Sequence, residues 1–220
     1  MVGLLRRPLI TSLTISQREG SFPYRKGRIG LLPHPLPCIS EPRDCPASSD
    51  NQLKKDEEFM RLALVEAQHA FQANEVPIGA VLVHDDRVVS VARNEVEARS
   101  DPTAHAEMLC IQKGAKVLGW RLTESTLYVT LEPCPMCAGA VLQSRLRRLV
   151  YGVRSPRLGA HQSWVPLLPI QEGESTPVNG PQRPHPFHPY MLVNDGILED
   201  ECGEILKLFF QQKRERHSLQ

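Results

Sequence analysis

Apolar residues along the chain recur with two periods, which predict its helices and strands. A first helix is predicted from about residue 56, because four apolar residues recur there at helical spacing: Met60, Leu64, Ala67 and Phe71. Residues 78–84 and 87–92 are apolar segments on either side of an Asp-Asp pair, which predicts a β-hairpin. The remaining helices are predicted at about 104–117, 135–144 and from 197, and the remaining strands at 126–131, 147–153 and 190–193.

The order of these elements predicts the fold class. Strands alternate with helices after the opening hairpin, which is typical of an α/β protein. Helices on both faces of a mixed sheet form a three-layer α/β/α sandwich. We therefore expect this architecture, with a central sheet of about five strands.

The first fifty residues do not resemble the rest of the chain. They are rich in proline, and up to residue 40 they hold a single acidic residue, Glu19, among six basic ones. This composition indicates an organelle transit peptide, and the alternative is a disordered extension without an address. The chain is expected to divide into this extension, a folded domain at 51–216 that contains a Pro- and Gly-rich loop at 154–188, and a tail at 217–220.

Charge is distributed unevenly along the chain. The formal net charge is +1, but residues 1–49 carry seven basic and three acidic groups, so they are net +4 and the remainder is net −3. Contact with nucleic acid through this weakly acidic body would have to be local. No apolar run approaches the roughly 18 to 20 residues that span a bilayer, so no membrane partner is expected.

Six cysteines in 220 residues are too few for a disulfide scaffold. Cys134 and Cys137 stand out because they form a Pro-Cys-Pro-Met-Cys motif. The other four divide into two core residues of predicted helices and two incidental residues of the extension: Cys110 and Cys202, then Cys38 and Cys45.

A third candidate metal ligand is His105, which lies 29 residues before Cys134 in the motif T-A-H-A-E-M. A catalytic zinc ion has three protein ligands and one open position, and these three residues supply three ligands. A fourth is not evident, since there is no second C-x-x-C and no paired histidine at finger spacing. The helix predicted to start at Pro135 would favour thiolates at its N-terminus. An isolated C-x-x-C could also be a redox pair.

His-x-Glu followed by Pro-Cys-x-x-Cys is the signature of zinc-dependent nucleobase deaminases. Zinc lowers the pKa of bound water to about 7, so hydroxide can attack a ring carbon that carries an amino group. Glu107 is not needed as a ligand and is expected to shuttle protons. The residues themselves therefore lead to a hydrolytic deaminase without identifying the base.

Longer stretches resemble the bacterial tRNA-specific adenosine deaminases of the cytidine/deoxycytidylate deaminase superfamily, across about residues 56–215. They include E-V-P-I-G-A-V-L-V, D-P-T-A-H-A-E-M and T-L-E-P-C-P-M-C-A-G-A, while H-P-F-H-P-Y-M-L-V resembles the chloroplast branch. The resemblance implies a cytidine-deaminase-like fold, a homodimer and a chloroplast location. It implies that adenosine is converted to inosine at the wobble position (34) of a tRNA anticodon stem-loop, by zinc-bound hydroxide and a glutamate proton shuttle.

The resemblance also assigns roles to individual residues. One Zn²⁺ would be held by His105, Cys134 and Cys137, with Glu107 as the catalytic proton shuttle. Substrate binding would fall to Asn94, which in the family hydrogen-bonds the flipped nucleotide, and to the turn that contains Val76 and Pro77. A turn-forming role is the alternative for Asn94. Ser155 departs from the family, which usually has an acidic residue there in a loop near the anticodon.

Two other functions share the zinc signature. A deaminase of free guanine or cytosine-type bases would act without tRNA. A non-catalytic RNA-binding partner subunit would be expected to lose the shuttle glutamate, whereas Glu107 is present. As a group, eight basic residues fit a local RNA footprint: Arg145, Arg147, Arg148, Arg154, Arg157, Lys213, Arg214 and Arg216.

Overall fold

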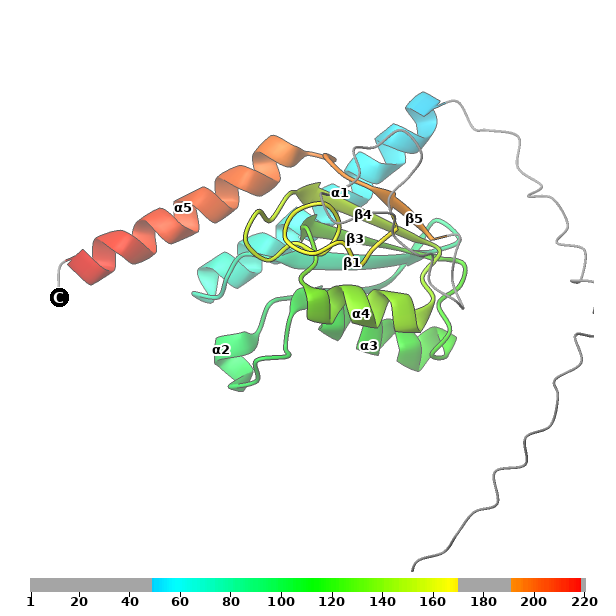
Figure 1. Ribbon diagram of the computed structural model, residues 1–220, viewed down its shortest axis with the longest axis horizontal. Helices are drawn as coiled ribbons and strands as arrows, with labels where there is room; N and C mark the ends of the chain where they lie inside the picture. The colour runs from blue at the N-terminus through cyan, green and yellow to red at the C-terminus, as the bar shows by residue number, and fades with distance from the viewer. Residues whose placement is uncertain (1–48, 170–190, 219–220) are drawn as a thin grey trace, which may run out of the picture. The chain divides into compact units, whose positions relative to one another are not determined.

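The computed structural model describes residues 49–169 and 191–218, which form a five-stranded sheet with helices on both faces (Figure 1). The strands lie in the order β2-β1-β3-β4-β5; β1 is antiparallel to β2 and β3, and β3, β4 and β5 are parallel. The elements in chain order are α1 (Ser49–Gln72), β1 (Gly79–His84), β2 (Arg87–Arg93), α2 (Val96–Arg99), α3 (Ala106–Leu118), β3 (Ser125–Leu131), α4 (Pro135–Ser144), β4 (Arg148–Val153), β5 (Leu192–Asn194) and α5 (Glu199–Ser218). The predicted three-layer fold with a mixed sheet is confirmed.

Two apolar clusters hold the layers together. On one face, α3 and α4 bury residues such as Leu109 and Val141 against Leu127 and Leu149 of the sheet. On the other face, α1 and α5 pack against alternate strand residues, and Gly79 allows the close approach of α1 because a Cβ there would overlap the Ala63 carbonyl. Neighbouring strand residues point to opposite faces of the sheet, and helices cover both faces. The strands β1, β3 and β4 therefore carry apolar residues on both sides and are almost fully buried.

The β1–β2 hairpin follows its predicted turn. Asp85 and Asp86 have φ values of 50° and 57°, as required by the two-residue turn that matches the twist of antiparallel strands. The prediction for the first helix was too short, because α1 begins at Ser49 and its first residues that the structure describes are exposed and show no apolar period. The short helix α2 was not predicted, since four residues are too few for a periodic signal.

Several predictions fall on parts of the chain outside the described residues. These parts are most of the extension, residues 170–188 of the long loop, the last two residues, and Cys38 and Cys45. By contrast, Cys110 and Cys202 are fully buried, as predicted. Among the helices of residues 49–169 and 191–218, none is long and apolar enough to cross a bilayer.

Candidate active site

Four chain connections meet at one edge of the sheet. The strands β2, β3 and β4 run in the same direction, because β1 is antiparallel to both β2 and β3, and β4 is parallel to β3. Their carboxyl ends therefore share an edge with the start of β1. Open α/β sheets commonly bind ligands beyond the carboxyl ends of their strands. The side chains brought there include Asn94 after β2, Glu132 after β3 and Ser155 after β4.

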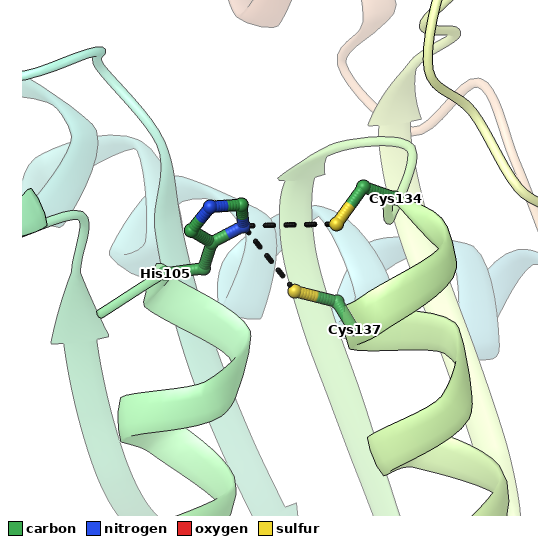
Figure 2. A group of neighbouring side chains, drawn as sticks. All are labelled: His105, Cys134 and Cys137. Atoms are coloured by element: carbon green, nitrogen blue, oxygen red, sulfur yellow. Dashed lines mark hydrogen bonds between the residues drawn. The ribbon is translucent and has the colours of Figure 1, made fainter. Parts of the chain in front are cut away.

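The three predicted metal ligands meet at this edge. His105 is the N-cap of α3 and Cys134 is the N-cap of α4, while Cys137 lies in the first turn of α4 behind Pro135. The Nδ1 atom of His105 is 3.7 Å from the Sγ atom of Cys134 and 3.5 Å from that of Cys137 (Figure 2). Two helix starts thus place three ligand atoms within 4.8 Å of one another.

This spacing fits a tetrahedral zinc ion. Zn–S bonds of about 2.3 Å and Zn–N bonds of about 2.05 Å place sulfur and nitrogen about 3.6 Å apart at the tetrahedral angle. The measured separations of 3.5 and 3.7 Å bracket that value. No other group of three such side chains with metal-binding spacing occurs in the described part of the chain. Three protein ligands with one coordination position left over are typical of catalytic zinc.

The acidities of the two thiols also favour a bound cation. Hydrogen bonds with Cys137 and His105 lower the pKa of Cys134 to about 4. The hydrogen bond to Cys134, together with burial, raises the pKa of Cys137. The Cys134 sulfur in turn raises the pKa of His105. Two thiolates this close together would repel each other, so a cation beside them and the dipole at the N-terminus of α4 would both favour the deprotonated pair.

Glu107 is buried beside the metal ligands, in the first turn of α3. Its side chain is 3% exposed, and burial raises the pKa of its carboxyl group. Within the part of the chain that the structure describes, its Oε2 atom has no hydrogen-bond partner. Leaving a buried polar atom unpaired costs about 1–3 kcal/mol, so such an atom in a native fold calls for a functional reason. The oxygen is available to a molecule that enters the site.

The predicted substrate-binding residues lie at the same edge. Asn94 is 4% exposed, and its backbone N–H donates to the Ile78 carbonyl at 3.0 Å. This bond joins the end of β2 to the turn that contains Val76 and Pro77. The next residue, Glu95, donates its N–H to the carbonyl of Ala104, directly before His105. Asn94 therefore lies between the turn and the ligand-bearing segment, while its contact with a substrate stays a prediction.

No motif in the sequence singles out Glu75, a buried carboxylate that orients Asn94. Its Oε2 atom accepts a hydrogen bond from Nδ2 of Asn94 at 3.3 Å, and its Oε1 atom accepts one from the Ala98 N–H at 2.8 Å. Because a carboxylate can only accept, it fixes which end of the Asn94 amide faces it. An acidic residue embedded in an apolar segment, as in N-E-V-P-I-G, is the signal that could have identified Glu75.

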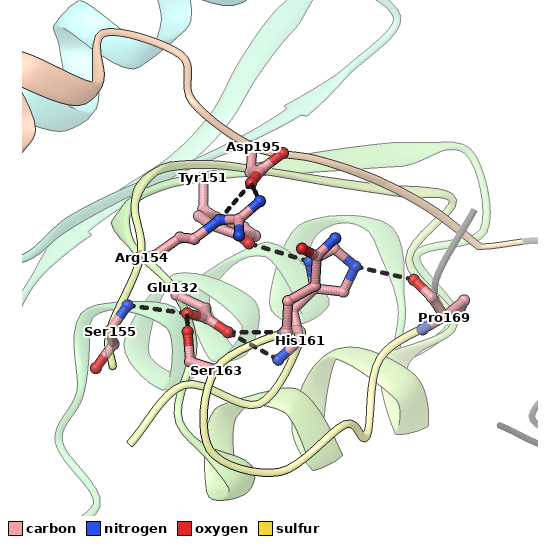
Figure 3. A network of polar contacts seen from close by, with 9 residues as sticks. Glu132, Tyr151, Arg154, Ser155, His161, Ser163, Pro169 and Asp195 are labelled. Atoms are coloured by element: carbon pink, nitrogen blue, oxygen red, sulfur yellow. Dashed lines mark hydrogen bonds and ion pairs between the residues drawn. The ribbon is translucent and has the colours of Figure 1, made fainter. Parts of the chain in front are cut away.

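Glu132 is a second buried carboxylate that the motifs do not identify, and it organises the loop after β4 (Figure 3). It accepts hydrogen bonds from three backbone N–H groups and one hydroxyl: Ser155 at 2.9 Å, His161 at 2.9 Å, Gln162 at 3.1 Å, and the side chain of Ser163. The ring of His161 continues the network to the Tyr151 hydroxyl at 3.0 Å and the Pro169 carbonyl at 3.1 Å. The described part of the long loop is therefore tied to the segment that carries Cys134.

The proposed RNA footprint needs a correction. Arg148 forms a largely buried ion pair with Asp56 on the α1 side of the sheet, so it is not available to phosphates. Arg147 and Arg154 are paired with acidic side chains but remain about half exposed.

Comparison with known proteins agrees with this site. Residues 53–153 match the family model of the cytidine and deoxycytidylate deaminase zinc-binding region. The tRNA-specific adenosine deaminase of Bacillus subtilis is 41% identical over 165 residues, which cover 74% of this chain and 94% of the relative. The chloroplastic tRNA(adenine(34)) deaminase of Arabidopsis thaliana is 53% identical over 159 residues, 71% of this chain, but this chain spans only 12% of that relative.

A solved structure from a study of A-to-I editing by tRNA:A34 deaminases superimposes with a TM-score of 0.57 at 43% identity, covering 68% of this chain and 99% of that one. The sequence matches span most of the described domain, and the structural match adds the same arrangement of sheet and helices. The chain therefore belongs to the tRNA-specific adenosine deaminase family, which is built on the cytidine and deoxycytidylate deaminase zinc-binding region.

Proposed function

We propose that the protein hydrolyses adenosine to inosine at the wobble position of a tRNA anticodon. The observation that carries this proposal is the 41% identity that extends over 94% of the B. subtilis tRNA-specific enzyme. The zinc signature alone would not distinguish this substrate from a free base. Because the chain spans 12% of the Arabidopsis relative, the proposal concerns the activity of the described domain.

The reaction consumes one water and releases one ammonia for each adenosine converted. His105, Cys134 and Cys137 would hold the zinc ion, which supplies an activated water as the nucleophile when bound. Glu107 would accept one proton from that water and deliver it to ring N1. It would then take the second proton of the same water from the new hydroxyl group at C6 and pass it to the departing amino group, which leaves as ammonia. Its buried Oε2 atom has no hydrogen-bond partner among the described residues, which suits this work.

The other residues at the sheet edge would hold the nucleotide. The Asn94 amide, oriented by Glu75, would hydrogen-bond the flipped nucleotide, and Val76 and Pro77 would form part of the wall around the base. The adenosine must leave the anticodon stack to enter the site. Extrusion costs less in a single-stranded loop than in a duplex, which favours a loop substrate.

The remaining features of the proposal come from relatives. The name of the Arabidopsis relative places that protein in the chloroplast, and we propose the same location here because residues 1–40 have transit-peptide composition. A homodimer is proposed by analogy with the bacterial enzymes. Residues 1–50 would then be the transit peptide, with the deaminase domain at 51–216.

The test is conversion of an anticodon stem-loop that carries adenosine at the wobble position. Reverse transcription reads the product inosine as guanosine. Wild-type protein should convert the stem-loop, and Glu107→Ala should lower kcat by about 10²–10⁴-fold while one zinc per chain stays bound. Glu58→Ala, which removes an exposed carboxylate of α1, is the matched control and should behave as wild type.

Three results would redirect the proposal. Wild-type protein with bound zinc that converts no stem-loop but deaminates guanine or cytosine would be a free-base deaminase. Full activity of Glu107→Ala would refute the assigned proton shuttle. A zinc-loaded wild-type protein that binds the stem-loop without converting it would point to the partner-subunit role.

A further inference from the structure

The loop after β4 is attached directly to the metal-binding segment. The backbone N–H of Ala160 donates to the carbonyl of Pro133 at 2.9 Å, and Pro133 immediately precedes Cys134. At its start, the loop is tied to the β5–α5 connection by the ion pair of Arg154 with Asp195 at 2.7 Å. The loop therefore lies beside the site at its Cys134 end, at the carboxyl edge of the sheet.

One carboxylate accounts for most of the loop's remaining polar contacts with this segment. Glu132 is 2% exposed, and both of its oxygens accept hydrogen bonds from residues 155–163 (Figure 3). Four donors converge on it, three of them backbone N–H groups of the loop. Only a group that has two acceptor oxygens and no donor can satisfy all four. The length and charge of this side chain thus set where the loop runs.

The loop is shaped to receive that carboxylate. Gly159 is buried, and a Cβ atom added to it would overlap the carboxylate of Glu132. Its φ lies outside the left-handed region, so the space taken by Glu132 is the constraint on this residue. Gly139, in helix α4, has nothing within 4 Å of the position that a Cβ atom would take, so it offers a matched comparison.

The outer side of the loop carries apolar side chains that the core does not use. Leu158 is 56% exposed and Trp164 is 60% exposed. Unstacked RNA bases bind by stacking on aromatic and apolar side chains, and exposed residues of this kind suit a loop that meets RNA. The neighbouring exposed Arg157 adds a cation for the phosphate backbone.

We propose that Glu132 is a positioning residue: it holds residues 155–163, and with them Trp164, beside the metal centre as a wall that binds the nucleotides flanking the target adenosine. This inference rests on the proposed function, since the flanking nucleotides belong to the RNA substrate. Glu132 acts through the loop and does not touch the reacting atoms. Its loss should therefore weaken RNA binding more than it slows the chemical step.

The test compares two variants that disturb the contact from opposite sides. Glu132→Gln replaces one acceptor oxygen by an NH₂ group, which faces donors and cannot accept their hydrogen bonds. Gly159→Ala keeps the carboxylate but adds a Cβ atom that overlaps it, so the loop has to move away. Both should raise KM for the anticodon stem-loop about tenfold, keep kcat within about threefold and retain one zinc per chain. Both should also speed hydrogen–deuterium exchange at residues 155–163. Gly139→Ala should match wild type in all four measurements.

The outcomes separate this inference from the proposed function. A fall in kcat at unchanged KM, or an unchanged KM despite faster exchange of the loop, would overturn the positioning role. Zinc loss from Gly159→Ala would overturn it as well, because the contact would then support Cys134. If Glu132→Gln does not fold, Gly159→Ala against Gly139→Ala decides. A zinc-loaded wild type that converts no stem-loop overturns the proposed function and the RNA-binding wall together, while loop exchange still reports whether Glu132 holds the loop.

Discussion

Replacing Asp56 with Asn tests how far the two sides of the fold depend on one buried carboxylate. Asp56 in α1 is 3% exposed. Its Oδ1 atom accepts hydrogen bonds from the Tyr128 hydroxyl at 2.8 Å and from Nη1 of Arg148 at 2.7 Å, and its Oδ2 atom accepts one from Nη2 at 2.7 Å. Arg148 also donates to Asn194 at 2.7 Å. The carboxylate therefore ties α1 to β3 directly and, through Arg148, to β4 and β5.

The expected loss follows from this geometry. Removing one partner of a buried ion pair costs about 3–5 kcal/mol, because the other charge stays buried without compensation. We expect about 3 kcal/mol for Asp56→Asn, since asparagine keeps one acceptor oxygen and the Arg148 side chain is 15% exposed. In urea, with a slope of about 2 kcal/mol per molar, the unfolding midpoint should fall by about 1.5 M.

The assay is urea unfolding followed by far-ultraviolet circular dichroism, at pH 7 and a fixed excess of zinc. Tyr128→Phe removes a single hydrogen bond and should cost about 1 kcal/mol. Asp56→Asn combined with Arg148→Met removes both charges and should recover most of the loss. Zinc content and kcat at 20 °C should stay unchanged, because the pair packs on the α1 face of the sheet and the ligands lie at the starts of α3 and α4. A loss below about 1 kcal/mol, or a double variant less stable than the single one, would show that the Asp56–Arg148 pair does not hold α1 on the sheet as the geometry implies.

Three further predictions concern the site and the core. Cys137→Ala should weaken zinc affinity more than 100-fold, whereas residues that only support a ligand typically cost roughly 10–100-fold. Added zinc should then no longer raise the unfolding midpoint of the variant. Stoichiometric zinc in the purified variant would contradict the predicted ligand set. Glu75→Gln presents a donor to the Asn94 amide, so KM for the stem-loop should rise about tenfold, and an unchanged KM would disprove that Glu75 orients Asn94. Burial raises the pKa of the Cys110 and Cys202 thiols to about 12. The two buried, protonated thiols therefore contribute their full stabilisation of the fold below the unfolded thiol pKa of about 8.5, and this contribution is lost as pH rises toward 12. Peptide-resolved alkylation at pH 8 should spare both in the native protein and modify both in concentrated guanidinium; rapid native labelling would show that they are not buried.

The local pattern of apolar and turn-forming residues was sufficient to predict secondary structure where the signal lies within one short stretch of chain. The Asp85–Asp86 turn, the buried strands and the helix that starts at Pro135 all appear where the periodicity predicts them. Pattern was insufficient where a segment lacks a period, as in the exposed first turns of α1 and the four-residue α2. The local pattern also could not show that Arg148, which lies among other basic residues in the sequence, is paired with Asp56, a carboxylate 92 residues away.

Residue type and spacing were enough to predict the chemistry of the site. The types and spacing of His105, Glu107, Cys134 and Cys137 predict three zinc ligands and one carboxylate that is not a ligand, because zinc chemistry constrains residue type as well as number. How these residues come together depends on the fold, which no local pattern shows. Because β1 is antiparallel to β2 and β3, and β4 is parallel to β3, the strands β2, β3 and β4 end at the same edge and bring distant connections together there. Burial also fixes the partners of Glu75 and Glu132 and leaves one oxygen of Glu107 unpaired, because the hydrogen bonds of a buried carboxylate depend on the groups that fold around it.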